Sequence, residues 1–305
     1  MKNKKSNFIG KRFTAGHTLI VIIISLFAIV CVYPFLLTIS GSFTSASDAL
    51  EYGYRLFPKH ISSLAYNYVV SRKKVIIRSY GVTIFVTVFG TVASLAVNSL
   101  SGFAISRKNM KFRRIINFYV LFTILFSGGM VPWYLICVNV YKLKDSIFAM
   151  ILPCLASAWN VFLFRNYFAS IPDEMYESAK IDGAGDFRIY CSIYLKLSAP
   201  VIATVTLFTG LGFWTSWYQA LMLIDNSDLH PLQLLLRNLE NELRFLKNAS
   251  LKGGANSQLI ESLAELPDDS VKMAMVIVTT GPILLLYPFI QRYFVKGIMV
   301  GAVKG

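Results

Sequence analysis

Six long apolar stretches restrict this chain to folds that cross a lipid bilayer. An α-helix needs about 20 mainly apolar residues to span the hydrocarbon layer, and within that layer only helices or closed barrels satisfy the backbone hydrogen bonds. We therefore predict an all-α, polytopic membrane protein with six transmembrane helices. The predicted spans are His17–Ser40, Tyr80–Ile105, Ile115–Val140, Ile147–Phe164, Pro200–Ile224 and Met273–Ile290.

The composition agrees with a membrane protein and argues against two other classes. Only 15% of the 305 residues are charged, whereas a soluble domain carries about 25%. The net charge is +14, but Lys and Arg flank apolar segments, as in loops that face an anionic membrane surface, so we expect no nucleic-acid partner. The four cysteines and three histidines lack metal-ligand spacing, so we expect no metal and no cofactor.

Basic residues beside the spans predict the orientation of the chain. Five Lys or Arg residues precede the first span, and five more lie in the short loop "RKNMKFRR". The positive-inside rule places both segments in the cytoplasm. A cleaved signal peptide is the alternative for the first span, but the apolar run is longer than such peptides usually have. We predict a multi-pass protein of the plasma membrane with both termini in the cytoplasm.

The predicted spans lack the groups that would let the chain drive transport or chemistry by itself. Their interiors hold no Asp, Glu, Lys, Arg or His, which argues against a proton-coupled carrier and against a membrane enzyme. An ion-coupled secondary transporter stays open, because a sodium site can be built from carbonyls and hydroxyls at a broken helix. The phosphate-binding sequence G-x-x-x-x-G-K-[ST] is also missing, so ATP-driven transport requires another polypeptide.

Two groups of polar and aromatic residues inside the spans are candidates for a translocation path. In the second span, small and weakly polar residues form a stripe that faces other helices or a water-filled path, not lipid. In the fifth span, aromatic faces lie beside hydrogen-bond donors, a combination that suits a sugar. Helix packing and an interfacial aromatic belt explain the same residues. The candidates are Thr87, Thr91, Asn98, Trp214, Trp217 and Gln219.

A helix break and an amphipathic segment complete the pattern. The stretch "SGGMVPWY" places Gly128, Gly129 and Pro132 inside the third span, and a break at this depth requires protein or a cavity to satisfy the backbone. The segment after Pro231 repeats leucine at helical spacing with charges opposite, which predicts an amphipathic helix on the outer face. Its leucines are Leu232, Leu235, Leu236, Leu239, Leu243 and Leu246.

The segment Ile171–Pro200 is polar and helix-forming, although apolar stretches flank it. Pro172 suits a first helical turn, acidic residues follow it, and Ser170 is the expected N-cap. Gly183 can adopt a positive φ and end this first helix. A second helix with one apolar face follows, formed by Phe187, Tyr190, Tyr194 and Leu197. The result is a bent helix pair in the cytoplasm, suited to docking in a groove of a soluble partner.

The motif "ESAKIDGAG", followed by "LKLSAP", resembles the EAA loop of binding-protein-dependent ABC importer permeases. Ser178 replaces the first alanine of the usual pattern, and Lys196 stands where the family often has proline. Other stretches resemble the carbohydrate-importer subgroup, and within it the lipoprotein- and polygalacturonan-type permeases of Gram-positive bacteria. These stretches are "LFPKHISSLAYNYVV", "FSGGMVPWYLI", "PLQLLLRN" and "YPFIQRYFVKGIMVGAVKG".

This resemblance implies a type I ABC importer permease architecture with a cytoplasmic coupling helix. It implies a non-enzymatic subunit that forms half of a path for a carbohydrate, with an oligosaccharide as the expected cargo. The implied partners are a second, homologous permease, two copies of a cytoplasmic ABC ATPase and an extracellular solute-binding lipoprotein, besides membrane lipid. The residues implied in ATPase coupling are Glu177, Ser178, Ala179, Asp182, Gly183 and Ala184.

The same resemblance divides the chain into parts. We expect a basic cytoplasmic tail at 1–16, then a first transmembrane helix at 17–40 with an external segment at 41–79. The core permease domain is expected at 80–294, including the EAA loop at 171–200, and a second cytoplasmic tail at 295–305.

Overall fold

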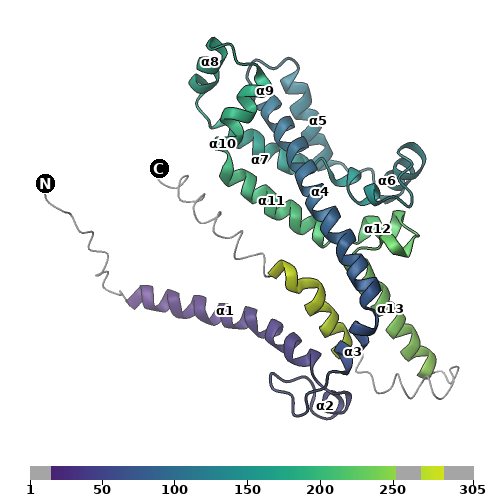
Figure 1. The fold of residues 1–305 in the computed structure, drawn as a ribbon. Helices are drawn as coiled ribbons and strands as arrows, with labels where there is room; N and C mark the ends of the chain where they lie inside the picture. Colours follow the sequence, from purple (N-terminus) through teal and green to yellow (C-terminus); the bar gives the residue numbers. More distant parts are fainter. Residues whose placement is uncertain (1–14, 252–268, 285–305) are drawn as a thin grey trace. The chain divides into compact units, whose positions relative to one another are not determined.

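The computed structural model describes residues 15–251 and 269–284, and within these ranges the chain is helical (Figure 1). The chain divides into two compact units. One combines residues 1–71 with 249–277, and the other combines residues 72–248 with 278–305. The terminal tails predicted at 1–16 and 295–305 lie almost wholly outside the described residues.

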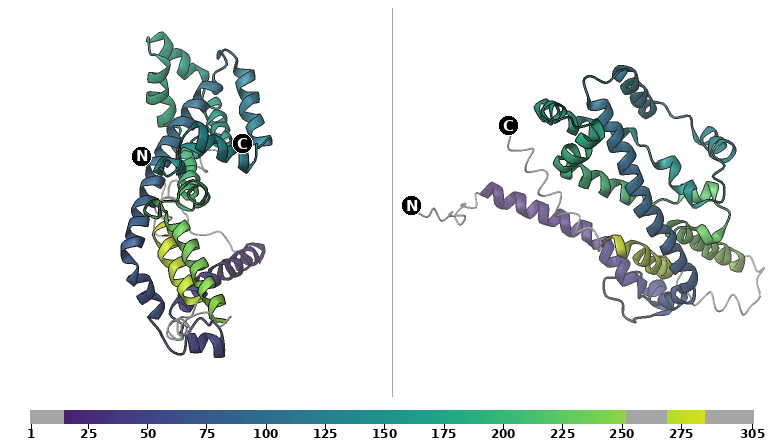
Figure 2. Two further views of the ribbon diagram at one scale, coloured as in Figure 1. Left: turned by 90° about the vertical axis from the view of Figure 1, so that its right-hand side faces the viewer. Right: turned by 45° about the horizontal axis from the view of Figure 1, so that its top comes forward.

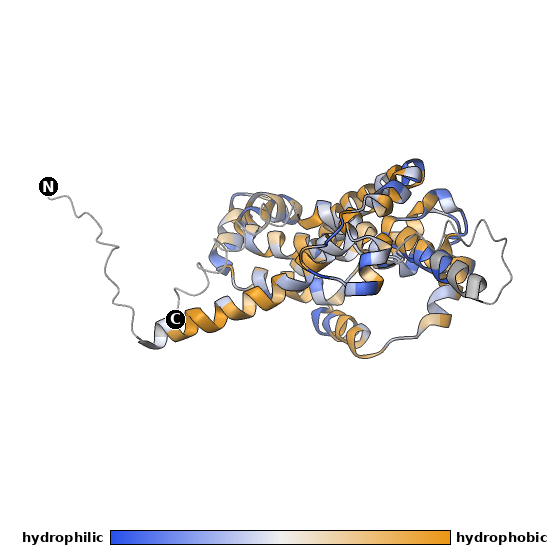
Figure 3. Ribbon diagram, turned by 90° about the horizontal axis from the view of Figure 1, so that it is seen from below, coloured by the Kyte–Doolittle hydropathy of each residue, from blue (hydrophilic) through white to orange (hydrophobic). Residues whose placement is uncertain are grey.

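The first unit contains an isolated apolar helix. Helix α1 (Ala15–Ser42) includes an apolar run of 25 residues, Thr18–Ser42. The described residues of the chain bury none of the most apolar part of this run. Figure 3 shows the apolar colour along most of this helix. Its side chains therefore face lipid or another subunit. Two short helices follow in this unit, α2 (Ala46–Tyr52) and α3 (Leu64–Ser71).

The second unit is organised around one long helix, α4 (Lys73–Ser106). It lies beside α7 (Ala158–Ala169) and α11 (Ala199–Trp214) (Figures 1 and 2). Close approach depends on two glycines of α4: a Cβ at Gly90 would lie 2.8 Å from the Phe213 ring, and one at Gly102 would lie 2.6 Å from Phe164 Cβ. In lipid the hydrophobic effect does not drive helices together, so their association depends on close packing. The small residues of α4 allow that close packing.

The described helices account for up to five of the six predicted spans. Two helices, α1 and α4, are long and apolar enough to cross a membrane by themselves. Three bent helix pairs are long and apolar enough when each pair is counted as one span. The pairs are Arg113–Leu125 with Met130–Val140, Ile147–Cys154 with Ala158–Ala169, and Asp186–Leu197 with Ala199–Trp214, bent by 115°, 48° and 84°. The sixth predicted span is helical at residues 269–284, and residues 285–290 lie outside the described part.

The helix break predicted inside the third span is present. The span at 115–140 breaks between α5 (Arg113–Leu125) and α6 (Met130–Leu135), where Gly129 has φ 84°. Two other predicted spans were wrong as single continuous helices. The span at 147–164 begins with 3₁₀ turns around Pro153 before α7. The span at 200–224 ends at Trp214, and α12 (Tyr218–Leu223) is separate. Hydropathy alone does not register such interruptions of the helical backbone.

The amphipathic helix predicted after Pro231 is present as α13 (Leu232–Leu251). Leu232 and Leu239 are buried, as is Leu234, which lay outside the predicted leucine set. The backbone N–H of Leu232 donates to Thr83 Oγ1 at 2.9 Å, so a side chain of α4 satisfies one free amide at this helix start. The side chains of Leu243 and Leu246 lie outside the described set.

Candidate functional site

The polar segment forms two short helices that meet at Gly183. Helix α8 (Asp173–Ile181) is followed by α9 (Asp186–Ile189), the π-helical turn η4 (Tyr190–Tyr194) and α10 (Leu195–Leu197). Gly183 has φ 77°, as predicted. Its N–H donates to the Lys180 carbonyl at 3.0 Å, and the Ala184 N–H donates to the Ala179 carbonyl at 2.9 Å. This pair of bonds is a complete Schellman motif, which ends α8 in one defined direction.

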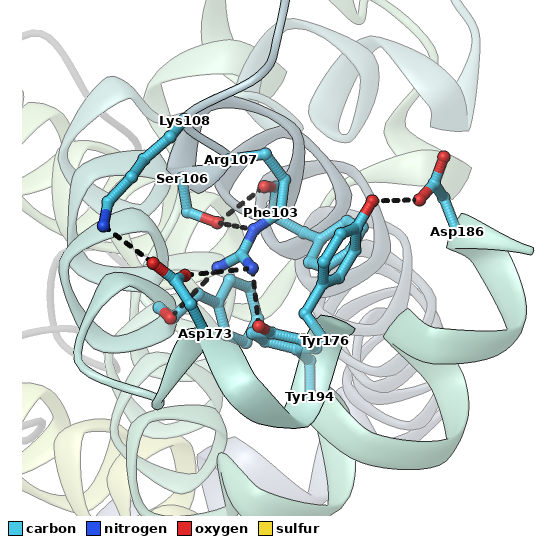
Figure 4. A network of polar contacts seen from close by, with 9 residues as sticks. Phe103, Ser106, Arg107, Lys108, Asp173, Tyr176, Asp186 and Tyr194 are labelled. Carbon is cyan, nitrogen blue, oxygen red and sulfur yellow. Dashed lines mark hydrogen bonds and ion pairs between the residues drawn. The ribbon is translucent and has the colours of Figure 1, made fainter. Parts of the chain in front are cut away.

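Side chains connect the two arms across this turn. Tyr176 Oη donates to Asp186 Oδ1 at 2.6 Å (Figure 4). Lys180 Nζ lies 2.8 Å from the same oxygen. The hydrogen bond to Asp186 raises the pKa of Lys180, so this ammonium stays charged at neutral pH. The bend is therefore held by side chains as well as by backbone.

The second arm is anchored by two tyrosines. Tyr190 and Tyr194 are buried against Phe103 of α4 and Phe168 of α7. Tyr190 Oη also forms a 2.6 Å hydrogen bond with Ser99 Oγ of α4. The aromatic contacts join this arm to both neighbouring helices.

The apolar face predicted for the second arm was half wrong. Tyr190 and Tyr194 are buried, but Phe187 is 69% exposed and Leu197 is 44% exposed. The segment changes from an α-helix to a π-helix at Tyr190. The wider turn changes the angular phase of the residues on its two sides, so an ideal 3.6-residue period does not describe the face.

The N-cap predicted for α8 was also wrong. Ser170 Oγ donates to the Tyr167 carbonyl at 2.7 Å, at the end of α7. Helix α8 begins after Pro172 without a side-chain cap. Asp173 in its first turn complements the helix dipole and accepts from Lys108 Nζ at 2.7 Å. This bond, the larger cause, and the Lys108 charge hold the pKa of Asp173 below its usual range.

The predicted coupling residues lie together around the end of α8. Ala179 and Ala184 are half-buried, whereas four residues are exposed: Glu177, Ser178, Asp182 and Gly183. Within the described part of the chain, the side chains of the first three make no hydrogen bond or ion pair. Their polar groups remain available to a partner.

Sequence reasoning missed the exposed Ile181 of this element, and it named Phe187 only as part of the apolar face of the second arm. Ile181 is 86% exposed and Phe187 is 69% exposed. The sequence already contained a signal for Ile181, because an apolar side chain between polar neighbours in a helix predicted to be cytoplasmic indicates a contact with a partner. Exposed apolar residues beside free polar groups are typical of a docking surface.

Three of the six path candidates line one cavity. Thr87 and Thr91 of α4 and Trp214 of α11 border a space of about 530 Å³, together with residues Pro282 and Ile283. Within the described residues, the Oγ1 atoms of both threonines are buried and lack a hydrogen-bond partner. Trp214 Nε1 already donates to the Thr279 carbonyl at 3.2 Å, so this side chain offers mainly its ring. The rest of the lining is almost wholly apolar.

The other three path candidates make structural contacts elsewhere. Asn98 is fully buried, where its Nδ2 donates to the Leu155 carbonyl at 2.8 Å and its Oδ1 accepts from the Ser157 N–H at 2.8 Å. Gln219 Nε2 donates to Cys154 Sγ at 3.2 Å. The Trp217 ring lies 4.0 Å from the Arg237 guanidinium carbon. Among the described residues, no three His, Cys, Asp or Glu side chains come together as metal ligands.

These features define a class: an all-α membrane protein that presents a bent polar helix pair between two apolar helices, as importer permeases do. The chain belongs to the family of binding-protein-dependent transport system inner membrane components, which it matches over residues 98–300. It is therefore a membrane-embedded transport component, and the resemblance inferred from the EAA motif is confirmed.

Individual relatives agree with this family. The chain is 38% identical to the polygalacturonan/rhamnogalacturonan transport system permease protein YtcP of Bacillus subtilis, over 92% of this chain and 95% of the relative. It is 37% identical to Protein LplC of the same organism, over 90% of each chain. A solved bacterial ABC transporter involved in the import of the acidic polysaccharide alginate contains a chain of similar fold, with a TM-score of 0.77 and 28% identity, covering 93% of this chain and 100% of that one.

These matches settle the broad class of the protein. The type I permease fold and the non-enzymatic role, as expected from the sequence, are confirmed by the family and its relatives. The alternative of an ion-coupled secondary transporter gains no support from them.

Proposed function

We propose that this chain is a permease subunit of an ATP-driven importer for an oligosaccharide. The observation that carries the proposal is the exposed turn at Gly183, which presents unpartnered polar groups from a helix pair packed firmly on α4 and α7. Relatives named for polygalacturonan, rhamnogalacturonan and arabinooligosaccharide transport support an oligosaccharide cargo. The chain would lie in the plasma membrane, with multiple spans and both termini in the cytoplasm.

The turn would act as the coupling helix. Glu177, Ser178 and Asp182 offer free polar groups, and Ile181 adds an exposed apolar side chain. A cleft on a cytoplasmic ATPase that buries the apolar side chain and pairs the carboxylates would fit this surface. Ala179, Gly183 and Ala184 would keep the surface compact, because their small size lets the partner approach closely.

The assembly would contain two permeases and two ATPases, served by an extracellular solute-binding lipoprotein. This chain holds no nucleotide-binding loop, so closure of the ATPases on ATP would supply the driving force. The apolar surface of α1, which the described residues leave uncovered, is available to lipid and to the second permease. The core permease would run from 80 to 294, with 1–16 and 295–305 as cytoplasmic tails.

Thr87, Thr91 and Trp214 are the residues of this chain that we propose for the translocation path. Their cavity offers two free hydroxyls and an aromatic ring, which match the hydroxyls and the C–H face of a sugar. Because most of the lining is apolar, the second permease would provide the remaining polar groups. Asn98, Trp217 and Gln219 would act beside the path by holding its walls.

A copurification experiment tests the proposal. The tagged chain is isolated from its own host in mild detergent, and the bound proteins are identified. We expect an ABC ATPase and a second permease, and we expect a tryptophan at Ala179 to abolish ATPase binding without reducing membrane insertion. A chain that retains no ATPase, or that takes up solute when reconstituted alone in an ion gradient, would contradict the proposal.

Uptake by intact cells defines the cargo. Labelled oligogalacturonides, alginate oligosaccharides and arabinooligosaccharides are compared in cells with and without the gene. We expect gene-dependent uptake of at least one of these oligosaccharides and none of the corresponding free monosaccharides. Gene-dependent uptake of an amino acid or a metal ion in place of all three sugars would refute a carbohydrate role.

A further inference from the structure

Arg107 occupies the point where α4 meets the polar element. It is the first residue after α4, and its side chain is only 13% exposed. A charged side chain is rarely buried to this degree unless its charge and its donors are matched. The sequence context "RKNMKFRR" is that of an ordinary basic loop, so the burial of this one member demands a structural reason.

The polar contacts of Arg107 reach four helical elements. Its Nη1 donates to Tyr194 Oη at 2.6 Å in η4, and its Nη2 donates to the Phe168 carbonyl at 3.3 Å near the end of α7. Its Nε donates to Ser106 Oγ at 3.1 Å on α4 itself. Asp173 Oδ1, in the first turn of α8, lies 3.9 Å from Nη1. Figure 4 shows these groups around one guanidinium.

Aromatic rings surround the same guanidinium. Its carbon lies 4.6 Å from the ring centre of Tyr194, 5.2 Å from that of Tyr176 and 5.5 Å from that of Phe103. Tyr176 belongs to α8, Tyr194 to η4 and Phe103 to α4. The planar guanidinium stacks on rings and donates in several directions at once, and the ammonium of lysine does neither equally well.

The neighbouring residue makes a useful comparison. Lys108 also reaches Asp173, at 2.7 Å, but its side chain is 77% exposed. Exposed ion pairs contribute little to stability, because water screens the two charges. Arg107 and Lys108 therefore carry the same charge and share one carboxylate, and they differ in burial and in the number of elements they join.

We infer that Arg107 is a positioning residue that locks both arms of the coupling element to the adjacent ends of α4 and α7. Load applied to α8 then moves α4, the helix that carries Thr87 and Thr91 at the cavity. Without the guanidinium, α8 and the turn at Gly183 can shift relative to the end of α4 while the long helix stays in place. This inference rests on the proposed coupling to an ATPase.

The test compares Arg107→Met with Lys108→Met in the assembled transporter. Both variants are made in a chain whose native cysteines are replaced by alanine and in which Thr87→Cys serves as a reporter. The complex is purified with its ATPase and reconstituted in liposomes. The labelling rate of the reporter by a small thiol reagent is measured with and without a nonhydrolysable ATP analogue, and ATP hydrolysis is measured in parallel.

Coupling between distant sites typically amounts to about 5–150-fold. We expect Arg107→Met to reduce the nucleotide-dependent change in labelling about fivefold or more, with the ATPase still bound and still hydrolysing ATP. Lys108→Met should retain the full change. A residue needed only for folding would lower the yield, the hydrolysis and the labelling change in proportion.

Each other outcome has a distinct meaning. Arg107→Met with the normal change, or Lys108→Met with an equal loss, would overturn the inference. Arg107→Lys keeps the charge and replaces the methionine variant if that variant does not accumulate. It should lose the same part of the nucleotide-dependent labelling change, because lysine lacks the planar donors of arginine. A full change in Arg107→Lys would also overturn it. Absence of a nucleotide response in the parent complex would instead defeat the proposed function.

Discussion

The backbone N–H of Ala184 donates to the carbonyl of Ala179 at 2.9 Å, which closes the end of α8 around Gly183. Together with the bond from the Gly183 N–H to the Lys180 carbonyl, it sets the direction in which the second arm leaves the first. Both residues are small and half-buried, so the turn is compact enough to enter a cleft on a partner. The following predictions test this turn, its surface and the helices behind it.

Replacing Gly183 by alanine or proline should impair coupling. A left-handed backbone costs a non-glycine residue about 1–2 kcal/mol, and proline additionally removes the N–H that donates to Lys180. A Cβ would meet no atom within 4 Å, so backbone strain alone accounts for the effect of alanine. We expect weaker ATPase association and uptake in Gly183→Ala, and complete loss in Gly183→Pro. Gly185→Ser is the matched control, since Gly185 has φ −71°.

Reversal of the charge at Glu177 should weaken ATPase binding without unfolding the chain. This carboxylate is exposed and has no polar partner within the described residues. Loss of a buried interfacial charge pair removes about 2–5 kcal/mol, so association of Glu177→Lys should weaken by about 30-fold or more. Copurification of the ATPase at graded salt measures this. Glu51→Lys is the control, because Glu51 lies in the segment predicted to be external, and this variant should bind the ATPase normally. Normal ATPase binding by Glu177→Lys would show that Glu177 is not part of the interface.

A larger residue at Gly102 should destabilise the packing of α4 on α7. The added Cβ would lie 2.6 Å from Phe164 Cβ and 3.0 Å from the Arg165 backbone nitrogen, and backbone cannot move aside easily. Overpacking of this kind costs about 1–3 kcal/mol. Thermal denaturation of the detergent-solubilised protein should show a lower midpoint for Gly102→Ala. Gly81→Ala, on the same helix in open space, should not lower the midpoint, because alanine favours a helix more than glycine does.

Replacing Asn98 by alanine should lower stability and leave uptake per folded molecule intact. The change leaves the Ser157 N–H without its acceptor, Asn98 Oδ1, whereas the Leu155 carbonyl loses one of two donors and still accepts from Ser94 Oγ at 2.9 Å. Each buried group left unpaired costs about 1–3 kcal/mol. Asn139→Ala, at an exposed position, is the control for thermal denaturation. If Asn98→Ala instead raised KM for uptake at normal stability, the side chain would belong to the path.

Thr91→Val should change uptake but not stability. The Thr91 hydroxyl is buried without a partner in the described structure, so an isosteric methyl leaves nothing unsatisfied. If the hydroxyl contacts the solute, KM for uptake should rise about 5–150-fold, corresponding to about 1–3 kcal/mol. Thr206→Val is the control, because Thr206 borders the same cavity but its hydroxyl already donates to the Ile202 carbonyl at 2.7 Å. Equal KM values for both variants and the parent would exclude Thr91 from the path.

Local chemistry explains the predictions that the structure supports. The turn at Gly183 depends on one positive φ, and the helical segments depend on apolar runs. The partial failures have two different causes. Ser170 bonds the Tyr167 carbonyl three residues before it, at the end of α7, in place of the start of α8. Asn98 satisfies a turn more than 50 residues away, and that partner is not visible from sequence neighbours.

The sequence by itself determined that the chain is a helical membrane protein of the importer-permease family with a bent polar element, because lipid solvation and glycine dihedrals act over a few residues. Tertiary structure alone decided that Arg107 is buried among Phe103, Tyr176 and Tyr194, and that Thr87 and Thr91 share a cavity with Trp214. Those arrangements depend on how α4, α7 and α11 pack. Packing depends on shape complementarity between segments far apart in the chain.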